Sequence, residues 1–404
     1  MNSDLTRIYA SALVPYAEPM VAETLLREAE AATGLSDWGG ARWGETRFRR
    51  RFDALCQSLE SDAELSTPGR SRAHSRLHVM LCSRLRQVRW RAERGEGAPI
   101  VAPLIGTGLP RAGTTFLHNL IAQDPGNLSA TAAQSAIPVP PPGTDAALEE
   151  ERVALYRRIL AFQSLSDPYV SDIHPYVAEA SEECVFIQES SGSALYGAYF
   201  NVPAFSALAA ADFPDAYAWQ KGMMQTLQEG RTFDRWALKA PGHMMTWSLM
   251  FDTFPGARVF LNHRDPGKVI PSIASLLTAL YSAFSDRVFD PQALGASMLS
   301  SWKNAMDEVM AWRAAHPEVV VVDVIYSKLI ADPIGEAERL YAAFGLDLSA
   351  GAKQRMEQFL KVDHHGKGAP REYRLADYGL TEADIEATFG DYIDRMGVVR
   401  EKRK

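Results

Sequence analysis

The chain has 404 residues, of which 47% are hydrophobic and 23% charged, and its formal net charge is −8. These fractions are ordinary for a packed globular protein, so they exclude a largely disordered chain and a collagen-like one. The negative charge argues against a nucleic-acid binder that depends on a global basic field, although it is compatible with a local basic pocket. The length predicts two or three domains, or one large α/β domain with appendages.

The three cysteines predict a reducing, cytoplasmic environment. Cys56, Cys82 and Cys184 are far apart, odd in number and without a CxxC spacing, so they support neither a disulfide framework nor a cysteine-based zinc site. The first twenty residues lack the uninterrupted apolar stretch of a signal peptide. No stretch approaches the roughly 18 apolar residues that a spanning helix needs, so we expect no transmembrane segment.

Residues 1–97 have helical patterns. Helices are predicted over Val21–Ala32, Arg49–Leu65 and Ser71–Arg94. The third pattern alternates apolar residues with arginines, which favours a solvated face on a helix that also packs against the main domain; a membrane-surface or anion-binding face is the alternative. The first lysine of the chain is Lys221, so any anion site in the first half must use arginine, backbone N–H groups or helix ends.

The pattern changes at Ala98, where strands begin to alternate with helices. This alternation predicts right-handed crossovers and a parallel sheet. The strands expected are Pro99–Ile105, Trp236–Lys239, Arg258–Asn262 and Glu318–Ile325, and the helices include Phe116–Gln123, Glu149–Leu165, Leu299–Ala315 and Gly335–Phe344.

A glycine-rich loop, Gly106–Thr115, lies between the first of these strands and the next helix. Its residues 108–115, GLPRAGTT, fit GxxxxG followed by x-[ST], but Thr114 stands where nucleotide hydrolases have lysine. The N–H groups of such a loop and the start of the following helix attract a phosphate or sulfate-like group. Arg111 supplies positive charge, and the missing lysine argues against an ordinary ATPase or GTPase. A plain turn before a helix is the structural alternative.

Three segments resemble the sulfotransferases that use 3′-phosphoadenosine-5′-phosphosulfate (PAPS). Residues 108–125, GLPRAGTTFLHNLIAQDP, resemble their 5′-phosphosulfate loop. Arg258–Leu276 resembles their 3′-phosphate site, with Arg264 at a strand end and Ser272 in the next helix. An arginine can grip a phosphate bidentately and a serine can add a hydrogen bond. Trp236–His243 resembles their strand ending in lysine, here Lys239, and the likeness to the bacterial branch covers nearly the whole chain.

The resemblance implies a three-layer α/β fold, in which helices flank a parallel sheet like that of P-loop NTPases. We expect a helical N-terminal extension (1–97), a sulfotransferase domain (98–398) and a frayed tail (399–404). The implied reaction moves a sulfuryl group from PAPS, leaving PAP, to a hydroxyl of a small, hydrophobic or aromatic acceptor, an alcohol or phenol. No metal, nucleic acid or membrane span is expected, and a homodimer is possible.

Site roles follow from the same resemblance. Lys239 would stabilise the bridging or sulfuryl oxygens, and Arg264 and Ser272 would bind the 3′-phosphate. The 5′-phosphate would lie against Arg111, Ala112, Gly113, Thr114, Thr115 and Phe116.

The general base is left open. Many bacterial relatives have a glutamate near the proline-rich segment, where this chain has Gln134-Ser135. We place His243, soon after Lys239, narrowly ahead of Glu183, with Glu182 and His174 as further candidates. The aromatic stretch 196–219 is the best candidate for an acceptor pocket, although core packing is the favoured explanation for any single aromatic there. Residues 366–368 and Arg371 would close over the 3′-phosphate.

Two other functions compete with this one. A P-loop kinase or nucleotide hydrolase needs a Mg²⁺-binding carboxylate at the end of a core strand, whereas the strand at Arg258–Asn262 is followed by His263 and Arg264. A non-catalytic protein that retains the fold is favoured by the altered Gln134-Ser135 position.

Overall fold

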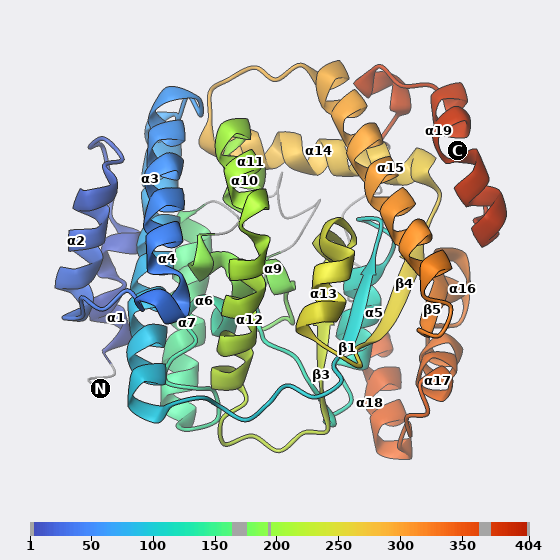
Figure 1. The fold of residues 1–404 in the computed structure, drawn as a ribbon, viewed down its shortest axis with the longest axis horizontal. Coiled ribbons are helices and arrows are strands. Elements are labelled where there is room, and N and C mark those ends of the chain that lie inside the picture. Colours follow the sequence, from blue (N-terminus) through green and yellow to red (C-terminus); the bar gives the residue numbers. More distant parts are fainter. Residues whose placement is uncertain (1–3, 164–175, 193–194, 363–372, 402–404) are drawn as a thin grey trace. The chain divides into compact units, whose positions relative to one another are not determined.

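The structure is a computed structural model that describes residues 4–163, 176–192, 195–362 and 373–401 (Figure 1). Its contacts group into two compact units. The helical unit comprises residues 1–100, 130–232 and 277–288, and the α/β unit comprises residues 101–129, 233–276 and 289–404. Because both units are discontinuous, this grouping differs from the linear division at residue 97, which stays a prediction.

The α/β unit is built on a parallel sheet in the order β2-β3-β1-β4-β5. Its strands are β1 (Leu104–Gly108), β2 (Asn127–Leu128), β3 (Arg235–Lys239), β4 (Arg258–His263) and β5 (Val321–Ile325). Gly106 pairs with Lys239, and Gly108 pairs with Asn262. The carboxyl ends of β1, β3 and β4 therefore meet at one edge, where open α/β sheets bind ligands. The predicted parallel α/β fold is confirmed.

Strand β1 begins five residues later than the sequence predicts. Pro99 and Pro103 have no N–H to donate to a ladder, and Ala102 between them has a positive φ of 39°. The apolar run thus starts as irregular chain and becomes a strand only after Pro103.

Helices cover the sheet of the α/β unit. They are α5 (Thr114–Ile121), α13 (Trp247–Thr253), α15 (Pro291–Ala315), α16 (Tyr326–Ala331), α17 (Pro333–Ala343), α18 (Ala350–Lys361) and α19 (Glu382–Met396), with 3-10 turns η4 (Pro241–Thr246) and η5 (Leu375–Tyr378). Leu117 and Leu120 of α5 and Leu340 of α17 pack with Leu104 and Phe260 of the sheet in one buried cluster. Burying such side chains contributes about 1.5–3 kcal/mol each, and this packing anchors α5 and the loop before it.

The helical unit holds the other helices. They are α1 (Leu5–Ile8), α2 (Ala22–Thr33), α3 (Glu45–Ser61), α4 (Thr67–Arg94), α6 (Ala132–Ala136), α7 (Ala146–Phe162), α9 (Cys184–Gln188), α10 (Leu195–Phe200), α11 (Pro203–Ala211) and α12 (Phe213–Leu227), with 3-10 turns η1 (Ala10–Leu13), η2 (Ala41–Trp43) and η3 (Glu189–Ser191). Ser66 caps α4 by accepting the N–H of Gly69, and Gly95 ends it.

The solvated face predicted for α4 is wrong for four of its arginines. Arg76, Arg84, Arg86 and Arg91 are each at most 3% exposed. Arg84 donates to the carbonyl oxygens of Ser190, Trp38 and Trp43 at 2.8–3.2 Å. These guanidinium groups bind within the unit, since an arginine has five donors to satisfy several carbonyls at once.

Helix α14 (Pro266–Phe284) also corrects an expectation. Among the described residues, this is the one helix that is long and apolar enough to cross a membrane, judged by length and composition only. In the structure 72% of its apolar window is buried. Core helices of globular proteins pass the same test, so the helix is weak evidence for a membrane span.

Candidate active site

The loop after β1 has a backbone that only particular residues allow. Gly108 has a φ of +142°, and a Cβ there would lie 2.3 Å from the carbonyl oxygen of Asn262. The side-chain amide of Asn262 donates to the carbonyl of Ala112 at 3.1 Å and so fixes the middle of the loop. Gly113, with a φ of +80°, then turns the chain into α5 at Thr114. The loop thus leads directly into a helix N-terminus, whose free N–H groups favour an anion.

Arg111 lies at the crown of this loop in the left-handed region, with a φ of +66°. That conformation costs a non-glycine residue roughly 1–2 kcal/mol, and such strain clusters at functional sites. The Nε of Arg111 donates to the Oγ of Ser272 in α14 at 3.3 Å. One predicted residue of the 3′-phosphate site therefore touches the predicted 5′-phosphate loop.

Arg264 follows β4 and reaches the same loop residue. Its Nη1 donates to the carbonyl of Arg111 at 2.8 Å, and its guanidinium stacks 4.0 Å from the ring centre of Tyr326. Its Nε and Nη2 donate to the two carboxylate oxygens of Glu401 at 2.6 and 2.9 Å. Burial would lower the pKa of Arg264, but the hydrogen bonds to Glu401 outweigh it and raise that pKa. The edge of Arg264 that carries Nε and Nη2, which contacts Glu401 here, is the edge that a phosphate would use.

Lys239 joins the loop from the end of β3. Its side chain is fully buried, and its Nζ donates to the Oγ1 of Thr115 in the first turn of α5 at 3.0 Å. The structure therefore brings Lys239, Arg111, Arg264, Ser272 and Thr115 together within the α/β unit, as the sequence predicts. Their roles toward a donor stay predictions.

The remaining residues of the glycine-rich loop and the first turn of α5 would offer mostly backbone groups to a ligand. Ala112 and Thr114 are buried, and Phe116 packs against the hydrophobic cluster of the sheet. The Phe116 ring is only partly buried, and the place of this residue beside the 5′-phosphate stays a prediction. His118 faces inward as well, with its Nε2 3.1 Å from the carbonyl of Ala237.

The candidate bases are divided between the units. His243 lies in η4 of the α/β unit, four residues after Lys239, and is buried. Glu182 and Glu183 belong to the helical unit, where the N–H of Glu183 donates to Oε1 of Glu182 at 2.9 Å and Glu183 precedes α9. His174, residues 366–368 and Arg371 lie outside the described residues. The choice of base stays a prediction.

The position of the family glutamate is structural here. Gln134 forms a capping box with Thr131 at the start of α6. Its side-chain amide also donates to the carboxylate of Glu149 at 2.8 Å, and Glu149 pairs with Arg152. An acid therefore lies beside this position, but an arginine already neutralises it.

The aromatic stretch 196–219 packs inside the helical unit. Its tyrosines, two of its phenylalanines and one tryptophan are nearly inaccessible: Tyr196, Tyr199, Phe200, Phe205, Tyr217 and Trp219 are each at most 2% exposed. These side chains serve the core, and the acceptor pocket predicted for this stretch stays a prediction.

Sequence reasoning missed Tyr326, Asn262 and Glu401. The first two carry a signal, because Tyr326 follows β5 and Asn262 lies near the end of β4, at the carboxyl edge of the sheet. Nothing in the sequence around Glu401 points to a role at the site. The tail predicted to fray is held here: the N–H of Glu401 donates to Asp265 at 2.8 Å, and Arg400 pairs with Asp265 at 3.1 Å. Residues 402–404 lie outside the description.

The chain belongs to the sulfotransferase family, because the sequence model of that family matches residues 103–350. Its curated relatives include the omega-hydroxy-beta-dihydromenaquinone-9 sulfotransferases Stf3 of Mycobacterium bovis and Mycobacterium tuberculosis, each 29% identical over 168 residues. That match spans 40% of this chain and 41% of each relative. Membership of this family confirms the resemblance to sulfotransferases and disfavours a kinase or nucleotide hydrolase.

Two solved structures are similar along most of the chain. Sulfotransferase STF1 from Mycobacterium tuberculosis is 27% identical, with a TM-score of 0.76 over 91% of this chain and 97% of that one. Sulfotransferase STF9 from Mycobacterium avium is 24% identical and shares the fold, with a TM-score of 0.83 over 96% of this chain and 100% of that one.

Proposed function

We propose that this protein transfers a sulfuryl group from PAPS to a hydroxyl of a small, hydrophobic or aromatic acceptor and releases PAP. The observation that carries the proposal is the convergence of Arg111, Arg264, Ser272 and Lys239 on one glycine-rich loop in the α/β unit. Two phosphate-binding groups and a lysine at one sheet edge match a donor that carries two separate phosphates and a sulfate.

The chain's own residues fit such a donor. The start of α5 and the loop N–H groups would hold the 5′-phosphate, with Arg111 adding charge. Arg264 would hold the 3′-phosphate bidentately beside Ser272. Lys239 lies at the first turn of α5, where it would stabilise negative charge as the 5′-phosphate leaves. PAPS supplies the activated sulfuryl group; the protein supplies alignment and electrostatics.

The transfer step needs one proton acceptor. The acceptor oxygen forms the new S–O bond while the S–O bond to the 5′-phosphate breaks, and the hydroxyl proton goes to a base. His243 is the preferred base, since it belongs to the same unit as Lys239 and follows it by one 3-10 turn. Glu183 and Glu182 are the alternatives.

The acceptor class follows from the relatives. The curated Stf3 enzymes act, by name, on an omega-hydroxylated dihydromenaquinone. This favours an alcohol on a hydrophobic molecule over a phenol. We further infer a bacterial, cytoplasmic enzyme, because the relatives are mycobacterial and Cys56, Cys82 and Cys184 are buried and form no disulfide.

Calorimetric titration of the protein with PAP, ATP and GTP tests the donor. We expect PAP to bind without Mg²⁺, and ATP and GTP to bind at least ten times more weakly. Mg²⁺-dependent ATP binding without PAP binding would overturn the proposal. PAP binding without transfer from PAPS to any of a panel of apolar alcohols and phenols would instead indicate a non-catalytic member of the family.

A further inference from the structure

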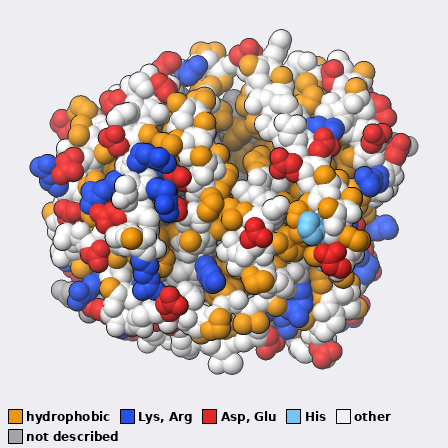
Figure 2. Space-filling model, viewed as in Figure 1, with side chains coloured by type: hydrophobic (Ala, Val, Ile, Leu, Met, Phe, Trp, Pro, Cys, Tyr) orange, Lys and Arg blue, Asp and Glu red, His pale blue; other side chains and the backbone are white. Residues whose placement is uncertain are grey.

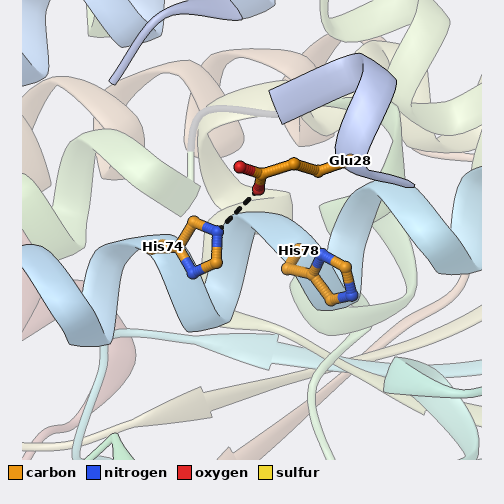
Figure 3. A group of neighbouring side chains, drawn as sticks. All are labelled: Glu28, His74 and His78. Atoms are coloured by element: carbon orange, nitrogen blue, oxygen red, sulfur yellow. Dashed lines mark hydrogen bonds and ion pairs between the residues drawn. The ribbon is translucent and has the colours of Figure 1, made fainter. Parts of the chain in front are cut away.

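Three potential metal ligands meet in the helical unit, outside the candidate active site (Figure 3). His74 and His78 are four residues apart on α4, so they share one face of that helix. Glu28 comes from α2, which packs against α4. One ligand atom from each side chain lies within 4.8 Å of the other two.

The hydrogen bonds of His78 leave one nitrogen lone pair for a ligand. Its Nε2 lies 3.1 Å from the carbonyl oxygen of Ile8, and a carbonyl only accepts, so Nε2 carries the proton. Nδ1 is then unprotonated, and it is buried without a hydrogen-bond partner. A neutral imidazole with an unused lone pair is the form that binds a metal.

His74 and Glu28 supply the second and third donors. The Nε2 of His74 lies 2.9 Å from Oε2 of Glu28, while its ring stacks on Tyr16 with centroids 3.9 Å apart. Both histidines are at most 3% exposed, whereas the Glu28 side chain is 36% exposed and leaves a route from solvent. The His74–Glu28 pair by itself accounts for two of the three side chains, but it gives no partner to Nδ1 of His78.

We propose that Glu28, His74 and His78 form a Zn²⁺ site that ties α2 to α4, with water as the fourth ligand. Two imidazoles and a carboxylate are donors that zinc prefers. Ligand atoms on one tetrahedral zinc lie roughly 3.3 Å apart, given bonds of about 2.0–2.2 Å. The pairs that include His78 therefore close by up to about 1.5 Å, whereas the Glu28–His74 pair, now 2.9 Å apart, opens slightly. The metal replaces the proton that Nε2 of His74 shares with Glu28.

Cys82, one turn further along α4, is left out of the ligand set. Its Sγ lies 3.4 Å from Nε2 of His78, the nitrogen already used by Ile8.

Calorimetric titration of the chelator-treated full chain with ZnCl₂ tests the site, and it needs neither donor nor acceptor. We expect one Zn²⁺ per chain and a melting temperature that rises with zinc. Glu28→Gln, which keeps a hydrogen-bond acceptor for His74 at a partly exposed position, should weaken zinc binding at least tenfold. The matched control Glu23→Gln, in the same helix and more exposed, should not weaken it.

A second variant keeps the test decisive if one protein folds poorly. His78→Gln should also lose zinc binding, while its circular dichroism without metal matches that of the unchanged chain. Absence of stoichiometric zinc binding by the unchanged chain overturns the proposal. Zinc binding that survives both Glu28→Gln and His78→Gln overturns it as well.

Discussion

Arginines serve opposite purposes in the two units of this protein. In the α/β unit, Arg111 lies in the loop after β1, and Arg264 directly follows β4. Both therefore lie at the carboxyl edge of the sheet, where open α/β sheets bind ligands. In the helical unit, Arg76, Arg84 and Arg86 are buried in one helix and bind carbonyls, a carboxylate and aromatic rings. The same residue type thus lies at the candidate ligand site in one unit and connects buried segments in the other.

The difference teaches where local sequence is informative. An arginine of the candidate phosphate site is placed by its own strand and loop, so its neighbours in sequence identify it. A buried arginine is placed by segments far away: Arg86 donates to the carbonyl of Val139 at 2.6 Å, across 53 positions. Over α2 and α3, Figure 2 shows basic side chains interspersed with acidic ones, and Arg49 pairs with Glu45 there at 2.8 Å. Several charges on those two helices are solvated, unlike the buried arginines of α4.

The largest effect is expected from the interior of the helical unit. Arg76 pairs with buried Glu189 at 2.6 Å, and its guanidinium lies 3.8 Å from the ring centre of Tyr199. Arg76→Ala leaves the Glu189 carboxylate buried without its cationic partner, which should lower the free energy of unfolding by about 3–5 kcal/mol. Urea denaturation measures it. Arg27→Ala, which breaks an exposed pair with Glu23, should cost at most about 0.5 kcal/mol. Equal losses would remove the contrast between buried and solvated arginines.

The α/β unit should respond in catalysis. Lys239→Ala removes the charge beside Thr115, so kcat for sulfuryl transfer should fall by about 10²–10³-fold. Steady-state kinetics with PAPS measure it, and unchanged circular dichroism confirms folding. Lys221→Ala, an exposed lysine of α12, is the matched control and should stay within about twofold. An active Lys239→Ala enzyme would show that the buried lysine is structural.

Binding should separate the two phosphate sites from the acceptor. Arg264→Ala loses charged hydrogen bonds, each contributing about 1.5–3 kcal/mol, so PAP affinity should fall by about 10–100-fold while the KM for the acceptor changes little. Arg264→Lys should not restore it, since lysine lacks the bidentate fork. Lys268→Ala, which removes a cation from the first turn of α14, is the control. Equal weakening of donor and acceptor in a folded variant contradicts the assignment.

The smallest effect on PAP binding is expected from Glu401 in the C-terminal tail. Glu401 takes the Nε and Nη2 of Arg264 that a 3′-phosphate would need. Glu401→Gln weakens this competitor, so PAP should bind about 2–10-fold more tightly, as expected for the loss of roughly 0.5–1.5 kcal/mol. Titration calorimetry measures it, with Glu338→Gln of α17 as control. Unchanged or weaker PAP binding would mean that the tail does not compete.

Most of the sheet could be predicted from short apolar runs. Strands β3, β4 and β5 lie within the predicted stretches or one residue beyond them. The two-residue strand β2 is too short to show a period, and β1 begins late because prolines occupy its predicted start. The helix bounds of α2, α3 and α4 differ from prediction by a few residues, as caps and glycines decide them.

The candidate site was predictable where its residues follow strands. Lys239 ends β3, Arg264 directly follows β4, and Arg111 lies in the loop after β1, so strand prediction places them at one edge. Glu401 could not be found in this way, because 137 positions separate it from Arg264. The buried side of α4 was equally hidden, since periodicity locates apolar residues but does not show which charged residues find carbonyl partners.

Position 111 is where stability and activity favour different residues. Glycine there would avoid the left-handed cost of roughly 1–2 kcal/mol, set against its own entropic cost of about 0.5–1 kcal/mol. Selection for thermal tolerance alone would therefore drift toward glycine, and selection for turnover would hold the arginine. The residue found at this single site in evolved or engineered variants is thus a record of which pressure dominated.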